Sequence, residues 1–189
     1  MLLVAFEGID GSGKTTLAEY AAKELRAPLL SHLTSTPVGR FAREAILSKS
    51  LHPLSEALLI LSAFAELETL YDLHDLIIAD RHLPSFLAYQ AAVNGHDVRF
   101  LKKLIRALNL RLPDLVIYCD VPLQTAFKRL RKRGRVYDIE APKVQSRVAA
   151  VYKRILSSFK VRKVPTDTFL TKSIALAVDA IRQEREARR

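Results

Sequence analysis

Cysteine and long apolar runs are nearly absent from this chain of 189 residues. Its single cysteine, Cys119, cannot form an internal disulfide, which argues against a disulfide-stabilised secreted domain. No run of about 18 apolar residues is present, so we expect no transmembrane helix and no membrane partner. The stretch from Met1 to Phe6 lacks the basic segment and the small-residue cleavage site of a signal peptide. Together these absences predict a cytoplasmic protein.

Repeats and linkers are missing as well. No internal repeat and no stretch rich in glycine, serine and proline divides the sequence. A length of 189 residues suits one compact domain with a substantial core, and hydrophobic residues make up 49% of the chain. We therefore expect a single domain over residues 1–189.

Positive charge is in excess. The formal net charge of +10 at pH 7 indicates polyanionic partners, either nucleotides or nucleic acid. Six of the eight residues over 128–135 are lysine or arginine, although runs of this kind are most often solvated basic faces. The charge alone leaves both kinds of partner open.

Short apolar segments alternate with longer amphipathic ones. The expected strands cover residues 2–6, 28–33, 75–80, 114–120 and 159–164. The expected helices cover 14–26, a long stretch from Pro53 with Leu54, Leu58, Leu61 and Ala65 on one stripe, 84–94, 97–109, 122–133, 141–157 and 168–187. Three of the strands are apolar almost throughout, which is typical of strands covered by helices on both faces. The alternation predicts an α/β fold with a five-stranded, mostly parallel sheet that binds ligands at its strand C-terminal ends.

The first expected strand runs directly into a phosphate-binding loop. Its sequence, GIDGSGKT, matches G-x-x-x-x-G-K-[ST] at every fixed position and precedes an expected helix. The loop aims backbone N–H groups at phosphate, and the helix adds its positive N-terminal end. The nucleotide is expected to contact Gly8, Ile9, Asp10, Gly11, Ser12, Gly13, Lys14, Thr15 and Thr16. Lys14 would reach the β- and γ-phosphates, and the Thr15 hydroxyl would bind Mg²⁺. The pattern predicts a P-loop fold with three layers, α/β/α.

Three classes of phosphate-loop protein differ in where the phosphoryl group goes. A switch GTPase needs a guanine-reading N/T-K-x-D, and residues 171–174 read TKSI, without the aspartate. A nucleic-acid-dependent ATPase usually needs a larger chain or oligomer-forming elements, which are not evident here. A kinase of a small acceptor needs a second anion site that faces the loop.

The segment ADRHLPSFLAYQ, residues 79–90, supplies a candidate for this second site. Asp80 and Arg81 end a buried strand, beside the phosphate loop if the sheet is parallel. Arg81 could hold the acceptor phosphate in a bidentate fork, and Asp80 could hold Mg²⁺ through water. A plain ion pair at the strand end is the alternative.

At these residues the sequence resembles the thymidylate kinase family. FEGIDGSGKTT is similar to the family's phosphate loop, and DRH-x-x-S-x-x-AYQ to its DR[YH]-x-x-S-x-x-AY segment. LPDLVIYCDVP resembles the family's fourth strand, and KRGRVYDIE stands in the place of its lid. The resemblance covers roughly residues 1–160.

The resemblance implies transfer of the γ-phosphoryl group of ATP to dTMP, giving dTDP, with Mg²⁺ and in a homodimer. Nucleic acid is then an improbable partner. It implies that the acceptor contacts Asp10, Arg43, Phe64, Arg81, Ser85, Tyr89 and Gln145. A kinase of another nucleotide or nucleoside, or a nucleotide-regulated nucleic-acid-binding ATPase, remains an alternative.

The expected lid, about residues 131–142, adds candidate catalytic arginines. Some family members carry an arginine inside the phosphate loop, where this chain has Gly11. The lid should then supply the charge that stabilises the transferring phosphoryl group, from Arg131, Arg133 or Arg135. With Lys14, Asp10 and Arg81, these form the expected catalytic set. A solvated basic face is the alternative for the run.

The thymine site departs from the family pattern. The family places a stacking phenylalanine on the long helix and, four residues later, an arginine that reads the base edge. Here Phe64 could stack, but Glu68, or Leu67 in a shifted register, stands where the arginine should be. We therefore expect a relaxed base preference, unless Arg40 or Arg43 reads the base instead.

Overall fold

The computed structural model describes residues 1–49, 51–134 and 137–188. A five-stranded sheet lies at its centre, with the order β2-β3-β1-β4-β5 and every neighbouring pair parallel. The strands are β1 (Leu2–Glu7), β2 (Leu29–Leu30), β3 (Leu76–Asp80), β4 (Leu115–Asp120) and β5 (Val161–Pro165). The predicted parallel α/β sheet is confirmed.

Helices follow the strands, and the sequence pattern predicts all of them except the helix over Pro37–Ser48. They are α1 (Lys14–Leu25), α2 (Pro37–Ser48), α3 (Pro53–Tyr71), α4 (Leu83–Asn94), α5 (Val98–Ala107), α6 (Leu123–Lys132), α7 (Pro142–Ile155) and α8 (Leu170–Glu186). Two short 3₁₀ turns, η1 (Asp138–Glu140) and η2 (Leu156–Ser158), flank α7. Prolines occupy the first position of α2, α3 and α7, where the missing N–H costs no hydrogen bond. None of the helices in the described ranges is both long and apolar enough to cross a membrane.

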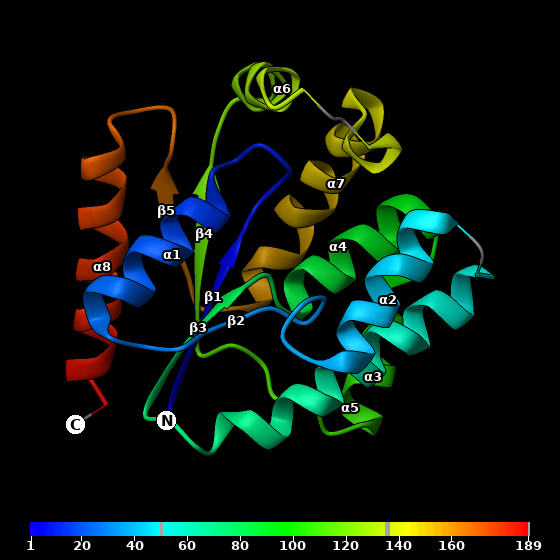
Figure 1. Ribbon diagram of the computed structural model, residues 1–189, viewed down its shortest axis with the longest axis horizontal. Coiled ribbons are helices and arrows are strands. Elements are labelled where there is room, and N and C mark those ends of the chain that lie inside the picture. Colours follow the sequence, from blue (N-terminus) through cyan, green and yellow to red (C-terminus); the bar gives the residue numbers. More distant parts are fainter. Residues whose placement is uncertain (50, 135–136, 189) are drawn as a thin grey trace.

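Helices cover both faces of the sheet, which gives three layers (Figure 1). Along β1 the side chains alternate: Leu2, Val4 and Phe6 pack in a core with α1 and α8, whereas Leu3 packs in a core with α3, α4 and α7. All six residues of β1 are buried. This two-sided burial explains why the strand is apolar without alternation.

Two predicted features differ from the structure. The second strand, expected over 28–33, is limited to Leu29–Leu30 because the chain then turns, with N–H groups of Thr34 and Ser35 bonded to the Ser31 carbonyl. On α3 the expected stripe is also wrong. Of the stripe only Leu61 is buried, whereas Leu54, Leu58 and Ala65 are exposed. The buried residues of this helix are Ala57, Ile60, Leu61, Ala63, Phe64, Leu67 and Tyr71.

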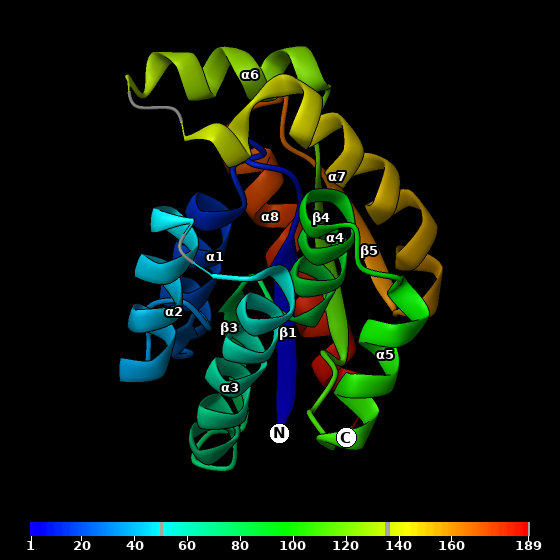
Figure 2. The same ribbon diagram turned by 90° about the vertical axis from the view of Figure 1, so that its right-hand side faces the viewer.

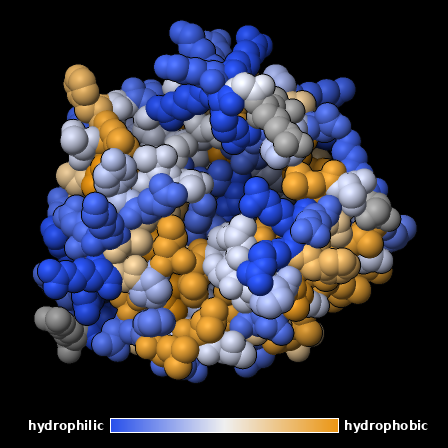
Figure 3. Space-filling model, in the orientation of Figure 1, coloured by the Kyte–Doolittle hydropathy of each residue, from blue (hydrophilic) through white to orange (hydrophobic). Residues whose placement is uncertain are grey.

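The topology brings together the two segments that the sequence predicts to bind anions. Because β1 pairs with β3, with Phe6 opposite Asp80, the loop after β1 lies beside Asp80 and Arg81. Helix α6 lies across the top of the sheet, above this loop (Figure 2). The face seen in Figure 3 is hollowed near its centre, and hydrophilic residues lie in the hollow.

Candidate active site

A cavity of about 580 Å³ opens at the C-terminal ends of β1 and β3. The phosphate loop and Arg81 form its inner end. The turn over residues 31–35, helices α2, α3 and α4, and residues 137–140 form the rest of its wall. A second cavity of about 310 Å³ lies on the other side of the loop, between α6 and the start of α8. Two neighbouring cavities that meet at a phosphate loop suit a donor and an acceptor of a phosphoryl group.

The phosphate loop has the backbone that its glycines predict. Gly8, Gly11 and Gly13 all have positive φ, and α1 begins at Lys14 immediately after them. A Cβ atom at Gly11 would lie 2.4 Å from the carbonyl oxygen of Ala126 in α6. This close approach is the physical reason why no side chain, and hence no arginine, fits at Gly11 here.

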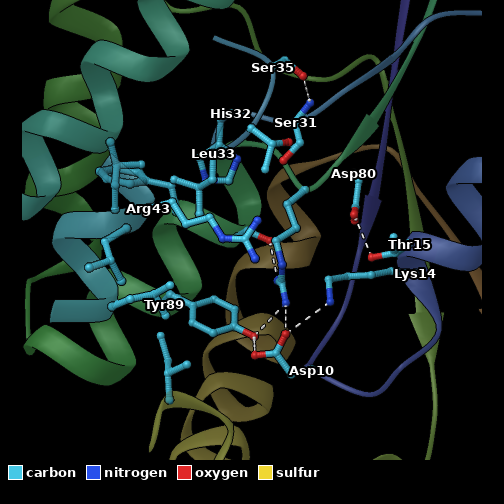
Figure 4. Close-up of a pocket in the computed structure, with 18 of the residues that line it drawn as sticks. Asp10, Lys14, Thr15, Ser31, His32, Leu33, Ser35, Arg43, Asp80 and Tyr89 are labelled. Carbon is cyan, nitrogen blue, oxygen red and sulfur yellow. Dashed lines mark hydrogen bonds and ion pairs between the residues drawn. The ribbon is translucent and has the colours of Figure 1, made fainter. Parts of the chain in front are cut away.

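Asp10 organises the junction between the loop and the acceptor cavity. Its Oδ1 atom accepts hydrogen bonds from Arg81 and from Lys14, the latter over 3.3 Å. Its Oδ2 atom accepts from the Tyr89 hydroxyl at 2.8 Å and from Gln145 Nε2 at 2.9 Å, as Figure 4 shows for Tyr89. Burial alone would raise the pKa of Asp10, but the charges of Arg81 and Lys14 outweigh it and hold that pKa below its usual range. Asp10 is therefore a carboxylate that fixes two cations side by side.

Arg81 reaches this junction through an unusual backbone conformation. Its φ of 69° lies in the left-handed region that non-glycine residues rarely adopt, at a cost of about 1–3 kcal/mol. The guanidinium also donates to the Gly8 carbonyl at 3.2 Å, to Ser85 Oγ at 3.0 Å and to the Tyr89 hydroxyl at 3.0 Å. The turn aims Arg81 back over the phosphate loop, where an acceptor phosphate would meet it.

Glu7, which sequence reasoning missed, binds the residues that follow Arg81. Its carboxylate is buried and accepts the backbone N–H groups of His82, at 2.7 Å, and Ser85. It also accepts the hydroxyls of Ser85 and Tyr152. Burial raises the pKa of Glu7, and the hydrogen bonds from Ser85 oppose this rise. The only signal in the sequence is an acidic residue at the end of a buried apolar strand.

Thr15 and Asp80 lie together as the metal prediction requires. Thr15 Oγ1 donates to Asp80 Oδ2 at 2.7 Å, and Asp80 Oδ1 is buried without a hydrogen-bond partner among the described residues. The described ranges hold no group of three or more His, Cys, Asp or Glu that could bind a metal without other ligands. This donor set fits Mg²⁺, which commonly binds through one or two protein oxygens together with waters and substrate phosphates.

The three predicted lid arginines differ in their surroundings. Arg133 lines both cavities and pairs with Glu140. Arg131 is exposed and lines neither cavity, because residues two positions apart point to different sides of a helix. Arg135 lies outside the described residues. The structure thus places Arg133 at both cavities and Arg131 at neither.

Arg129 is a further arginine at the loop that the sequence analysis missed. It lines the smaller cavity and donates to the Gly11 carbonyl at 3.4 Å and to the Thr166 carbonyl. Arg129 and Arg133 are four residues apart and so share one face of α6. This spacing within the basic run was the signal that could have found it.

The residues expected at the acceptor base need correction. Phe64 is 1% exposed and does not line the cavity, since its ring stacks on His32 with centroids 4.5 Å apart. Glu68 accepts from the Arg111 backbone N–H at 2.7 Å and also lies outside the cavity. Helix α3 turns both positions towards other neighbours. The rings that line the cavity near Phe64 are those of His32 and Phe86. Burial lowers the pKa of His32 to about 3, so its ring is neutral.

The other predicted acceptor residues do line the cavity: Arg43, Arg81, Ser85 and Tyr89. Gln145 is buried beneath it, bonded to Asp10 and to the Ile139 carbonyl. Arg43 lies opposite Thr15 and Asp80 in Figure 4. Arg40 is bonded to the Thr34 carbonyl at 3.2 Å and does not line the cavity.

Comparison with known proteins agrees with this geometry. A sequence model of the family described as thymidylate kinase matches residues 6–179. A thymidylate kinase of Mycoplasmopsis agalactiae is 31% identical over 183 residues, covering 84% of this chain and 80% of that protein. A thymidylate kinase of Thermomicrobium roseum is 36% identical over 140 residues, covering 68% of this chain and 67% of that protein.

Solved structures show the same fold. A thymidylate kinase from Candida albicans, described as having broad substrate specificity, superposes with a TM-score of 0.79 at 24% identity, covering 97% of this chain and 92% of its own. A deoxyadenosine kinase from M. mycoides superposes with a TM-score of 0.74 at 18% identity, covering 96% and 100%. The sequence match over most of the chain, with the phosphate loop and the D-R segment in place, shows that this chain belongs to the thymidylate kinase family.

Proposed function

We propose that the protein transfers the γ-phosphoryl group of ATP to a nucleoside monophosphate, with dTMP among its acceptors. The observation that carries the proposal is the Asp10 junction, where Lys14 of the donor loop and Arg81 of the acceptor cavity share one carboxylate. An oxygen of the acceptor phosphate attacks the γ-phosphorus, the bond to the β-phosphate oxygen breaks, and ADP leaves. The acceptor phosphate is already ionised at neutral pH, so no general base is needed.

Individual residues are assigned roles in this transfer. Lys14 and the loop N–H groups hold the β- and γ-phosphates, and Arg81 and Arg43 hold the acceptor phosphate. Arg133, which borders both cavities, stabilises the charge that spreads over the transferring group. Thr15 and Asp80 would hold Mg²⁺, which when bound neutralises phosphate charge.

The remaining expectations are part of the proposal. We infer a lid over about residues 131–142, a homodimer, and a cytoplasmic location. Family membership supports the dimer, which sedimentation of the purified protein would test. The single buried thiol of Cys119 supports a reducing compartment, which cell fractionation would test.

The acceptor range is expected to be broad. Neither Phe64 nor Glu68 reaches the cavity, so neither of the positions expected at the base provides a contact for thymine. In a coupled ADP-release assay we expect dTMP to be phosphorylated, with dUMP and at least one other of dCMP, dGMP and UMP within about two orders of magnitude in kcat/KM. A preference for dTMP above about 10⁴ over every acceptor but dUMP would contradict this expectation.

Arg81→Ala is expected to impair use of the acceptor more than binding of ATP. The loss of a charged hydrogen bond to the acceptor phosphate should raise the acceptor KM about 10- to 100-fold. The measurements are the acceptor KM and the dissociation constant of ATP, with Arg40→Ala, at an arginine that does not line the cavity, as the control. A collapse of ATP affinity with an unchanged acceptor KM would place Arg81 on the donor side instead.

A further inference from the structure

A polar cluster away from the phosphate-binding groups joins α3 to α4 at the wall of the acceptor cavity. We call Glu56, Gln90 and Asn94 the Glu56 cluster. Glu56 Oε1 accepts hydrogen bonds from Gln90 Nε2 and Asn94 Nδ2, each at 2.8 Å, and Asn94 Nδ2 also contacts Gln90 Oε1 at 3.0 Å. Glu56 and Gln90 both line the cavity, and Gln90 is 2% exposed. The amides therefore hold the carboxylate in one orientation at the cavity wall.

Glu56 differs from two of the other carboxylates that line the cavity, Asp10 and Glu140. Arg81 pairs with Asp10, and Arg133 pairs with Glu140. In the described part of the chain, no lysine, arginine or histidine pairs with Glu56, and its hydrogen bonds all reach Oε1. Neutral amides fix the carboxylate without compensating its charge. Glu56 Oε2 is thus left to accept a hydrogen bond from a ligand.

The cluster lies where a nucleoside would extend from the phosphate site. On α4, Ser85 and Tyr89 contact Arg81. The residue after each of them, Phe86 and Gln90, also lines the cavity. Gln90 is five positions after Ser85, about 7.5 Å along the helix axis. Ile60 of α3 and Phe86 supply apolar surface in the same cavity.

A monophosphate bound at Arg81 would therefore lay its base along Ile60 and Phe86. The edge of that base would then meet Glu56. On the neighbouring wall, the His32 ring is 4% exposed and its Nδ1 atom has no hydrogen-bond partner among the described residues. Because that Nδ1 atom is fully buried, the acceptor that a bound nucleoside would satisfy at this end of the cavity is Glu56 Oε2.

We propose that Glu56 Oε2 accepts a hydrogen bond from the exocyclic amino group of the acceptor base, so that cytosine, adenine or guanine monophosphates are favoured beside dTMP. The proposal rests on the function proposed above and specifies its acceptor. A carboxylate only accepts hydrogen bonds, and an amino group only donates them. Thymine instead presents one N–H group between two carbonyl oxygens, and a carboxylate repels those oxygens.

The test is Glu56→Gln, which keeps the shape of the side chain and one oxygen for the amides but removes the charge. We compare kcat/KM for dCMP, dAMP and dGMP with that for dTMP. The ratio of the best amino-bearing acceptor to dTMP is expected to fall about 10- to 100-fold, the effect of one charged hydrogen bond. Glu66→Gln, an exposed glutamate on the same helix, is the matched control and should keep the ratio of the unmodified protein.

A binding measurement separates this proposal from the reaction itself. Dissociation constants of the same four monophosphates, from calorimetry, should show the same fall in ratio for Glu56→Gln. If no monophosphate were phosphorylated, the proposed function would fail, and the binding ratio would still decide the role of Glu56. A ratio that stays within threefold, or rises, would overturn the proposal and leave the cluster as a link between α3 and α4. Thermal unfolding of both variants checks that each is folded.

Discussion

Lys14→Ala is expected to lower kcat about 10³-fold, the largest effect of any single substitution considered for this protein. Lys14 is 8% exposed, is the first residue of α1 and pairs with Asp10, where the β- and γ-phosphates of ATP would meet the loop. Burial and the neighbouring charge of Arg81 lower its pKa, so the site holds a cation at an electrostatic cost that bound phosphate would offset. Removing a positioned charge at the transferring group costs roughly 10²–10³-fold or more in rate.

The substitution should leave the fold intact. Asp10 keeps its contacts with Arg81, Tyr89 and Gln145, so no buried charge is left without partners. The measurements are kcat in the coupled assay and the midpoint of thermal unfolding. Lys23→Ala, an exposed lysine on the same helix, serves as the control. Turnover within tenfold of the unmodified protein, in a folded Lys14→Ala sample, would mean that the loop is not the donor site.

Sequence reasoning succeeded where the determinants are local. The phosphate loop is a run of eight consecutive residues, and its glycines, lysine and threonine are the residues that one phosphate-binding turn needs. The strands at Leu76–Asp80 and Leu115–Asp120 are apolar because helices cover both faces of the sheet. Such strands can be recognised from their residue composition alone. Their pairing with β1 then follows from the parallel topology.

Sequence reasoning failed where the decisive contact is distant along the chain. Helix α3 is apolar on several sides, so its periodicity does not reveal that Leu58 is exposed while Ile60 lines the cavity. Phe64 was assigned to the base from the family resemblance, although its ring stacks on His32. Glu56 meets Gln90 across 34 positions of sequence, and nothing in the neighbourhood of either residue indicates the pairing. Tertiary packing, rather than local pattern, selects these side chains.

Arg133→Met is expected to lower kcat about 10²- to 10³-fold with a smaller change in either KM. Arg133 borders both cavities, so its charge can act on the phosphoryl group between them. Charge that develops on the transferring group is greatest in the transition state, and a contact made there lowers kcat when it is lost. Gly11, closed off by α6, leaves no room for an arginine from the loop itself.

Arg131→Met is the matched control, because it removes another arginine side chain from a position two residues before Arg133. Arg131 is exposed and lines neither cavity, so kcat should stay within threefold. Arg135→Met completes the series of predicted lid arginines. If all three variants kept the kcat of the unmodified protein, the run would be only a solvated basic face. If kcat fell for Arg131→Met but not for Arg133→Met, the catalytic charge would come from the other side of α6, and the assignment to Arg133 would be wrong.

One structural effect must be separated from the catalytic one. Arg133 pairs with the buried carboxylate of Glu140, whose other oxygen accepts the backbone N–H of Tyr137 at 2.8 Å. Removing Arg133 leaves that carboxylate without this cation, which could disturb the segment that holds Tyr137 at the cavity. The double variant Arg133→Met with Glu140→Gln removes the uncompensated charge. If kcat stays low in the double variant, the lost arginine itself is responsible. If kcat recovers to that of the unmodified protein, Arg133 acts only by holding Glu140, and its place at the transferring phosphoryl group is refuted.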